Sequence, residues 1–216
     1  MKAAERKRKK ILKTAPTPVK GINLVQKTSE IPVLQALTAR EVEAGRKAIW
    51  VDVGNRSSTY KLAAHSREAM NNVKITRAFT AFQHHQAVNS LKQFIDQEKV
   101  LVLSNFPEIY TERQKASGEK KELFHEAWKT VKQLQKDRNL KVLVTAPGKT
   151  EGAFKIRYDA DKQIKAEKNS QGWKYSSENF KTSTYRSGKT VQTTIPYWSR
   201  REVEKWVEPT QPTATT

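Results

Sequence analysis

The sequence contains no cysteine. This absence excludes disulfide bonds, thiolate nucleophiles and the zinc and iron–sulfur sites that use cysteine ligands. Long hydrophobic runs are also missing: no apolar stretch approaches about 18 residues, so we expect no membrane-spanning helix. The N-terminus leads into further charge rather than into an apolar core, and we expect no secretory signal. These absences favour a protein of the cell interior.

Positive charge dominates what is present. The 216 residues include 41 Lys and Arg against 22 Asp and Glu, which gives a net charge of +19 and a pI near 10.0. This length fits one domain with tails. A protein this basic most often binds a polyanion, and nucleic acid is the commonest polyanion in cells.

The excess charge divides along the chain into +7 in residues 1–20, +8 in 21–150 and +4 in 151–216. We expect residues 1–20 to form a basic arm and linker, 21–207 one folded domain, and 208–216 a disordered polar tail. The arm is densest at Arg6, Lys7, Arg8, Lys9 and Lys10. Such a run serves as a nuclear address, as a nucleic-acid-binding arm or as a solvated, frayed helix, and the sequence leaves these three open.

Hydrophobic periodicity predicts an α/β fold. Short apolar strands are expected over residues 22–25, 48–53, 73–75, 100–103 and 142–144, with helices over 29–45, 58–70, 85–94 and 119–136 between them. This alternation favours a mainly parallel sheet flanked by helices. After Gly148 the pattern changes: Phe154, Ile156 and Tyr158 alternate with charged residues, which predicts a strand, and residues 182–195 resemble a hairpin. We therefore expect an antiparallel C-terminal extension.

Three stretches resemble the ATPase core of the archaeal RadA-type recombinases, a branch of the RecA-like family. The first joins Ala48–Asp52 to Arg56–Leu62, the second joins Ile75–Phe79 to His85 and Gln86, and the third runs from Val100 to Tyr110. The resemblance covers about residues 22–198. It implies a RecA-like sheet and a paralogue that acts in DNA recombination or repair.

The nucleotide-binding motif of that family is degenerate here. A P-loop needs G-x-x-x-x-G-K-[ST] between a strand and a helix, so that backbone N–H groups cradle phosphates. In Gly21–Thr28, Gln26 replaces the second glycine, and the only nearby strand lies inside the motif. Gly148–Thr150 and Gly188–Thr190 lack the first glycine. We expect none of the three to work as a P-loop, and we predict no cofactor.

The resemblance implies two further catalytic positions, and both are altered. Gly54 stands where the recombinases have a catalytic Glu, and Ser104 stands where their Walker B Asp helps to hold Mg²⁺. Asp52 is retained, and we expect it to cap a turn at the end of its strand. Together with the degenerate P-loop, these replacements predict that the protein is not an enzyme.

Other catalytic or metal-binding patterns are weak. His84 and His85 would point about 100° apart on a helix, so they do not share a metal ion easily. The sequence has no H-E-x-x-H and no G-x-S-x-G pattern. Asp159 and Asp161 lie among basic residues rather than in an apolar pocket that would raise a carboxyl pKa. We predict no catalytic and no metal-binding residues.

Basic residues interleaved with aromatic ones are the stronger functional signal. The resemblance implies that the loop after strand 100–103 faces single-stranded DNA, and that a second such loop follows Val144. Besides the arm, the candidate DNA-binding residues are therefore Arg113, Lys115, Lys120, Lys121, Lys149, Lys155, Arg157, Lys162, Lys165, Lys174 and Arg186. Aromatic residues lie among the last of these, namely Trp173, Tyr175, Phe180 and Tyr185. They either stack on unpaired bases or pack the hairpins against the sheet.

The sequence thus favours a non-catalytic RecA-like protein that binds DNA, largely through phosphate contacts, and assists homologous recombination or repair. We expect its partners to be DNA, with single strands among the options, and an active recombinase, but no membrane. Such a protein would be cytoplasmic and nucleoid-associated, or nuclear in a eukaryote. Two alternatives stay open: a residual ATPase that binds ATP through Lys27 or Lys149, and an interaction subunit that binds RNA or a ribonucleoprotein.

Overall fold

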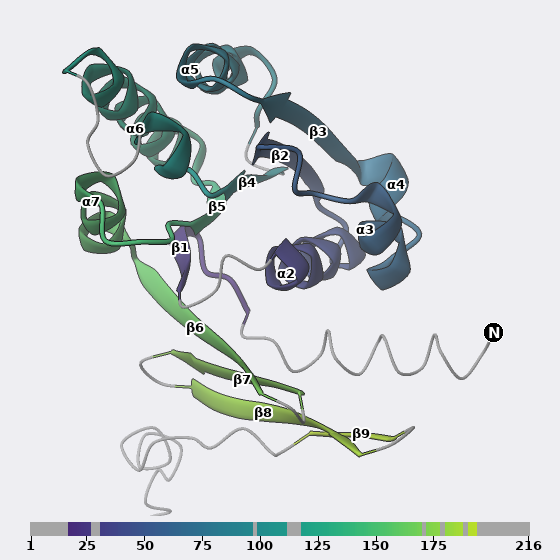
Figure 1. The fold of residues 1–216 in the computed structure, drawn as a ribbon. Coiled ribbons are helices and arrows are strands. Elements are labelled where there is room, and N and C mark those ends of the chain that lie inside the picture. Colours follow the sequence, from purple (N-terminus) through teal and green to yellow (C-terminus); the bar gives the residue numbers. More distant parts are fainter. Residues whose placement is uncertain are drawn as a thin grey trace, which may run out of the picture.

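The structure is a computed structural model that describes residues 17–26, 31–96, 99–111, 118–169, 172–177, 180–187 and 190–193. Several expectations fall outside this part of the chain: those for the arm residues Arg6–Lys10, for Arg113 and Lys115, and for the tail 208–216. Within the described residues, nine strands form one sheet in the order β3-β2-β4-β5-β1-β6-β7-β8-β9 (Figure 1).

The central part of the sheet is parallel. Its strands are β1 (Gly21–Gln26), β2 (Lys47–Val53), β3 (Val73–Ala78), β4 (Lys99–Ser104), β5 (Lys141–Thr145) and β6 (Lys162–Asn169). The strands in the middle are apolar on both faces, as β4 illustrates: Leu101 and Leu103 enter one buried cluster, whereas Val100 and Val102 enter the other. Helices must therefore cover both faces.

Two groups of helices provide that cover (Figure 1). On one face lie α2 (Ile31–Glu43), α3 (Thr59–His65) and α4 (Ala69–Asn72); on the other lie α5 (Ala81–Ser90), α6 (Gly118–Arg138) and α7 (Glu151–Asp159). Short 3₁₀ turns follow α5 and β4, at η1 (Leu91–Gln93) and η2 (Glu108–Tyr110). The longest helix, α6, buries the stripe Phe124, Ala127, Trp128, Val131 and Leu134, at the spacing that the sequence predicts.

The C-terminal strands are antiparallel. β7 (Gly172–Ser177) pairs with β6 and with β8 (Phe180–Ser187), and β9 (Thr190–Thr193) returns along β8. The pairing of Ser187 with Thr190 confirms the predicted hairpin. The predicted fold class is confirmed as well: an α/β protein with a mainly parallel sheet, flanking helices and an antiparallel extension.

One predicted strand is wrong, and two helices have other bounds. Residues 151–159 form the helix α7 rather than a strand, because Thr150 caps the first turn and Ala153 and Ile156 are buried at helical spacing. The helix expected over 58–70 begins at Thr59, where Ser58 provides the cap, but it breaks at Ser66, whose backbone is extended, into α3 and α4. The helix expected from His85 begins at Ala81, where Thr80 provides the cap.

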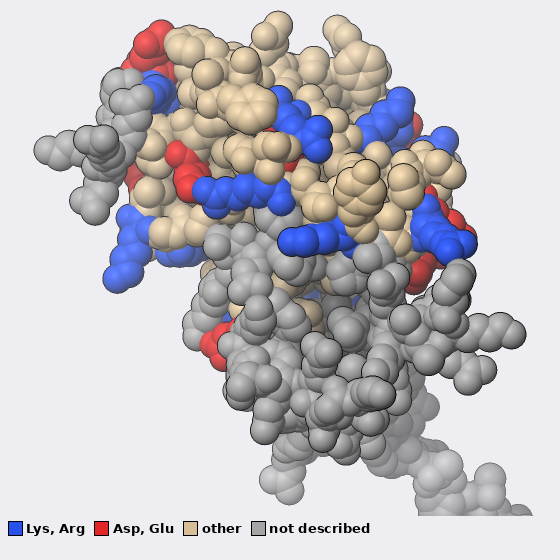
Figure 2. Space-filling view, turned by 45° about the vertical axis from the view of Figure 1, so that its right-hand side comes forward, with Lys and Arg blue, Asp and Glu red and all other residues tan. Residues whose placement is uncertain are grey.

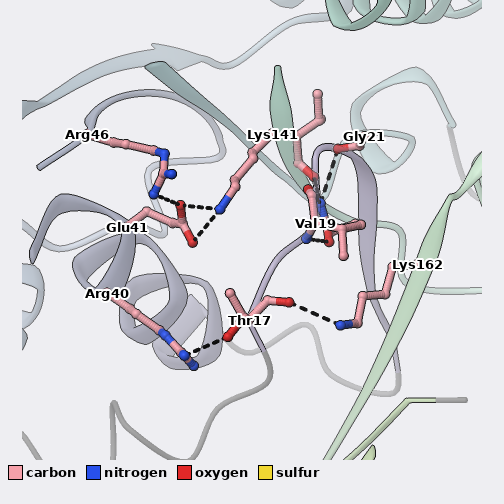
Figure 3. A network of polar contacts seen from close by, with 10 residues as sticks. Thr17, Val19, Gly21, Arg40, Glu41, Arg46, Lys141 and Lys162 are labelled. Carbon is pink, nitrogen blue, oxygen red and sulfur yellow. Dashed lines mark hydrogen bonds and ion pairs between the residues drawn. The ribbon is translucent and has the colours of Figure 1, made fainter. Parts of the chain in front are cut away.

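A network of polar contacts fixes the amino edge of the sheet (Figure 3). The buried carboxylate of Glu41, on α2, lies 3.0 Å from Lys141 Nζ at the start of β5 and 3.0 Å from the guanidinium of Arg46. The segment before β1 is attached nearby, because Arg40 donates to the Thr17 hydroxyl and Lys162 donates to the Thr17 carbonyl. These contacts connect α2, β5 and β6 at the end of the sheet opposite to the candidate site.

Candidate nucleic-acid interface

The carboxyl ends of the parallel strands bring three connecting loops to one edge. The loop after β2 meets the turn after β4 through the ion pair of Arg56 with Glu108, whose N···O distance is 2.9 Å. The loop after β5 leads directly into α7. In open parallel sheets this edge is where ligands bind, because the loops there are free to vary.

A cleft of about 720 Å³ opens between η2, α6 and α7 at this edge. Its apolar wall is formed by Pro107, Tyr110 and Phe124, and its polar residues include Lys121 and Lys149. The two loops that the sequence predicts to face DNA, those after β4 and β5, therefore lie on opposite sides of one cleft. The side chains of Arg113 and Lys115 fall outside the described residues.

The charged groups of the cleft differ in their surroundings. Lys121 Nζ is 2.9 Å from Glu151, and His125 Nε2 is 3.9 Å from the same carboxylate. The hydrogen bond and the positive charge of Lys121 hold the pKa of Glu151 below its usual value. Lys149 is exposed and makes no ion pair with any residue of the described part. Its charge is available to an anion entering the cleft.

Close packing positions α7 beside the cleft. A Cβ placed on Gly152 would lie 3.0 Å from two carbons of the Phe124 ring and 3.1 Å from Pro107 Cβ. A larger residue there would push against the cleft wall, so glycine favours this close approach of the first turn of α7. The far end of the helix is held by Asp159, which accepts a hydrogen bond from Trp128 Nε1 at 2.8 Å and lies 3.2 Å from Lys132 Nζ. Partial burial raises the pKa of Asp159, but these hydrogen bonds and the lysine charges outweigh it and lower the pKa overall.

Asp52, at the end of β2, is engaged in internal hydrogen bonds, one of them with Ser104, the residue at the position that the resemblance gives to a magnesium ligand. Asp52 is fully buried, and its Oδ2 accepts hydrogen bonds from Ser57 N at 2.9 Å and from Ser57 Oγ at 2.7 Å. Its Oδ1 accepts from Ser104 Oγ at 2.9 Å, and Ser104 Oγ in turn accepts from Trp50 Nε1 at 3.2 Å. The expectation that Asp52 caps a turn is confirmed.

The glycines that begin two of the three P-loop-like motifs have defined structural positions. Gly21 begins β1 with φ +121°, and a Cβ there would lie 2.5 Å from the carboxylate of Asp161, which accepts a hydrogen bond from Ile22 N. Gly148 has φ +83° in the short loop between β5 and the Thr150 cap. Gly188 and Lys189 lie outside the described residues, between β8 and β9. The first motif therefore contains a strand, as expected, and not a phosphate-binding loop at its first glycine.

A buried histidine stands behind the cleft. His84 Nδ1 and the Tyr110 hydroxyl are 2.7 Å apart, and His84 Nε2 has no hydrogen-bond partner among the described residues. Burial, reinforced by the neighbouring His85, lowers the pKa of His84 to about 3. Burial also raises the pKa of Tyr110. Both groups are therefore neutral at ordinary pH, and His84 is a core residue.

The structure brings together part of the predicted DNA-binding set. Lys121 and Lys149 line the cleft. Lys120 precedes Lys121 at the start of α6, and Lys155 and Arg157 lie on α7, whose first turn forms one side of the cleft. Lys165 is exposed on β6, next to the end of β1. Lys162 lies at the amino end of β6, away from the cleft, and donates a hydrogen bond to the Thr17 carbonyl. Lys174 and Arg186 lie in β7 and β8, where their backbones pair with Ser183 and Val191.

Basic side chains also occur away from this edge. Figure 2 shows Lys and Arg residues spaced across the face in view, with uncharged surface and some acidic residues between them. Charge alone therefore does not define the site, and its geometry must do so. Of the aromatic residues expected either to stack or to pack, Tyr175 is buried, and this burial raises the pKa of its hydroxyl to about 12.

The sequence reasoning missed two aromatic residues near the cleft. Phe154 and Tyr158 are exposed on α7, on the side opposite to the buried Ala153 and Ile156. The signal was present in the i, i+3 spacing of the small and branched residues behind the Thr150 cap, which indicates a helix rather than a strand.

Two kinds of site are absent from the described part of the chain. No group of three or more His, Asp or Glu residues there could hold a metal ion. No helix among those residues is long and apolar enough to cross a bilayer.

No family model matches the chain, and a search of characterised proteins finds no significant match.

Proposed function

We propose that the protein is a RecA-like DNA-binding protein without ATPase activity that assists recombination or repair. The observation that carries this proposal is the convergence of the loops after β4 and β5 on one cleft, with Lys121 and Lys149 on it and Lys155 and Arg157 on the adjoining helix. The architecture agrees with the RecA-like sheet that the sequence resemblance implies.

Electrostatics supports binding to a polyanion in particular. Each phosphate that a Lys or Arg neutralises releases condensed counterions, so a basic edge binds nucleic acid with an affinity that depends steeply on salt. Arg157 is held in place because its guanidinium donates to the Gly148 carbonyl at 2.7 Å. A fixed guanidinium loses less conformational entropy when it contacts a phosphate.

The absence of ATPase activity is supported by the chemistry at the strand ends. Both oxygens of Asp52 already accept hydrogen bonds from Ser57 and Ser104. Mg²⁺ bound by a nucleotide needs carboxylate or hydroxyl oxygens that are open to it. A chain with this arrangement retains the basic surface of the edge but not the groups that act on a γ-phosphate. An active recombinase, bound to the same DNA at the nucleoid, would then supply the hydrolysis.

Salt-dependent filter binding tests the proposal. Wild-type protein and DNA should give a log–log slope of about −3 or steeper, as expected for four or more phosphate contacts. The double variant Lys149→Gln, Lys155→Gln should have a shallower slope by about 2. The matched control is Lys61→Gln, Lys74→Gln, which removes two exposed lysines from α3 and β3.

The outcomes separate clearly. Absence of binding at about 50 mM salt, or a slope near zero, contradicts DNA binding. Equal effects of the two double variants would mean that the cleft and α7 are not the interface. Competition by RNA that exceeds competition by DNA would favour an RNA-binding subunit instead.

A further inference from the structure

The outward face of α7 carries two exposed aromatic rings. Phe154 is 54% and Tyr158 is 87% exposed, and the two residues lie one helical turn apart. Ala153 and Ile156 on the opposite side are fully buried, so the helix is already anchored without either ring. Packing of the fold therefore does not explain why two large rings stand at this place.

A cation lies close to each ring. The guanidinium carbon of Arg157 is 5.2 Å from the centroid of the Phe154 ring, and Lys155 Nζ is 5.8 Å from the centroid of the Tyr158 ring. Contacts of this kind attract a cation to the face of an aromatic ring. The α7 face therefore alternates planar rings with positive charges, and the hydrogen bond of Arg157 to Gly148 joins it to the cleft.

The acidic residues of the same helix are engaged elsewhere. Glu151 lies 2.9 Å from Lys121, and Asp159 is bound by Trp128 and Lys132, with Lys155 at a longer distance of 3.8 Å. Lysines of α6 balance these carboxylates, and the contact of Asp159 with Lys155 is the longest of the three lysine contacts. They do not cancel the charge of Lys149 and Arg157, so an anionic chain is the ligand that matches this face.

We propose that Phe154 and Tyr158 form a stacking platform for unpaired bases of a single-stranded nucleic acid. The phosphates of that strand lie against Lys149, Lys155 and Arg157. Aromatic side chains next to cations bind single strands because every base has a π-face and every nucleotide a phosphate. A duplex offers unstacked faces only at its ends. The inference rests on the proposed function and adds to it the strandedness of the ligand and the residues that select it.

Fluorescence anisotropy with labelled oligonucleotides tests the platform. The variant Phe154→Leu, Tyr158→Leu keeps apolar bulk and helix propensity but removes both π-faces. Its affinity for oligothymidylate, relative to its affinity for a duplex of equal length, should fall about tenfold or more. The matched control Tyr60→Leu, Phe94→Leu changes two other exposed rings, at 87% and 60% exposure, and should leave this ratio at the wild-type value. Circular dichroism spectra and melting curves establish that each variant is folded.

Photocrosslinking provides a second readout. Oligonucleotides with bromouracil, as DNA and as RNA, should crosslink to the peptide that contains Phe154 or Tyr158. Loss of this crosslink in the double variant supports stacking, and the relative yields identify the sugar that is preferred. If the wild type binds but the double variant keeps the wild-type affinity ratio, the platform is overturned although DNA binding stands. Crosslinks that form only at other peptides of the wild type have the same meaning. Failure of the wild type to bind any oligonucleotide overturns both.

Discussion

His84 Nδ1 lies 2.7 Å from the hydroxyl of Tyr110, in a site where both side chains are buried. The pair joins α5 to η2, which forms part of the cleft wall. Two further aromatic contacts surround it: the rings of His84 and Phe106 are 4.8 Å apart, and those of Tyr110 and Phe124 are 5.7 Å apart. A neutral imidazole therefore packs behind the aromatic wall of the candidate cleft.

This burial predicts a pH dependence of stability. The pKa of His84 is lowered from 6.5 to about 3, so between these values the unfolded chain binds a proton that the folded chain does not. The stabilisation is complete above about pH 6.5 and is lost as the pH falls towards 3. By pH 4.5 the wild type should lose about 2–3 kcal/mol of unfolding free energy through this one group. Urea titrations at a series of pH values measure it.

Two variants distinguish titration from packing. His84→Gln removes the proton uptake, so the stability gap between this variant and the wild type should narrow on acidification. Tyr110→Phe removes only the hydroxyl partner and should lower stability by about 1 kcal/mol without changing the pH slope. If the difference in unfolding free energy between the wild type and His84→Gln stays constant from pH 7 to 4.5, another group causes the loss of stability at low pH.

Gly152 gives a prediction about how α7 is attached. In Gly152→Ala, the new methyl group meets the Phe124 ring at 3.0 Å and Pro107 Cβ at 3.1 Å, so we expect a loss of about 1–3 kcal/mol. This loss would occur although alanine is the better helix former. Gly118→Ala, at the start of α6, has open space around its Cβ and is the control. It should be neutral or stabilising by up to about 1 kcal/mol. Calorimetric melting measures the stability of both variants. Equal changes in stability for Gly152→Ala and Gly118→Ala would contradict close packing at Gly152.

The buried ion pair of Glu41 with Lys141 should contribute more to stability than the exposed pair of Glu108 with Arg56. Glu41→Ala leaves the largely buried ammonium of Lys141 uncompensated, because the Glu41 side chain is only 2% exposed and is bound at 3.0 Å. The expected cost is about 3–5 kcal/mol. Glu108→Ala removes the exposed partner of Arg56 and should cost about 1 kcal/mol or less. Chemical denaturation measures both, and a double variant Glu41→Met, Lys141→Met should recover part of the first loss. A cost for Glu41→Ala no larger than that for Glu108→Ala would refute a buried ion pair.

Nucleotide binding has its own prediction. Because the oxygens of Asp52 are occupied by Ser57 and Ser104, magnesium and ATP at millimolar concentration should not raise the melting temperature. The measurement is differential scanning fluorimetry of the wild type with and without nucleotide. A rise that disappears in Lys27→Ala or Lys149→Ala would instead support a residual ATP site.

The sequence predicted the layered part of the fold because its signals are local. The apolar runs at 100–103 and 142–144 form β4 and β5, and the stripe from Phe124 to Leu134 lies on α6. The strand expected over Phe154–Tyr158 is wrong because three large residues at alternate positions also satisfy a helix when only Ile156 faces the core. The helix cap at Thr150 carries the correct signal.

The site could be predicted only in part. The sequence reasoning identified Lys121 and Lys149, but their cleft depends on how closely Gly152 approaches Pro107 and Phe124, which lie far away in the chain. No local pattern encodes that distance. His84 was not recognised as a core residue because the helix was expected to begin at His85, four residues after its observed start at Ala81. The register of α5, with Ala81, His84 and Val88 buried, follows only from the Thr80 cap.

The position of β1 also bears on how the protein is made. This strand pairs with β5 and β6, whose first residues come about 120 to 140 positions later in the chain. During synthesis one edge of β1 therefore stays unpaired until residues 141–145 have been made, and the other edge until residues 162–165 have been made. Leu24 and Val25 are exposed during that interval, and unpaired apolar strands are prone to aggregate. We expect the nascent chain to need a chaperone, or the early capture of β1 by α2, before the sheet can close around it.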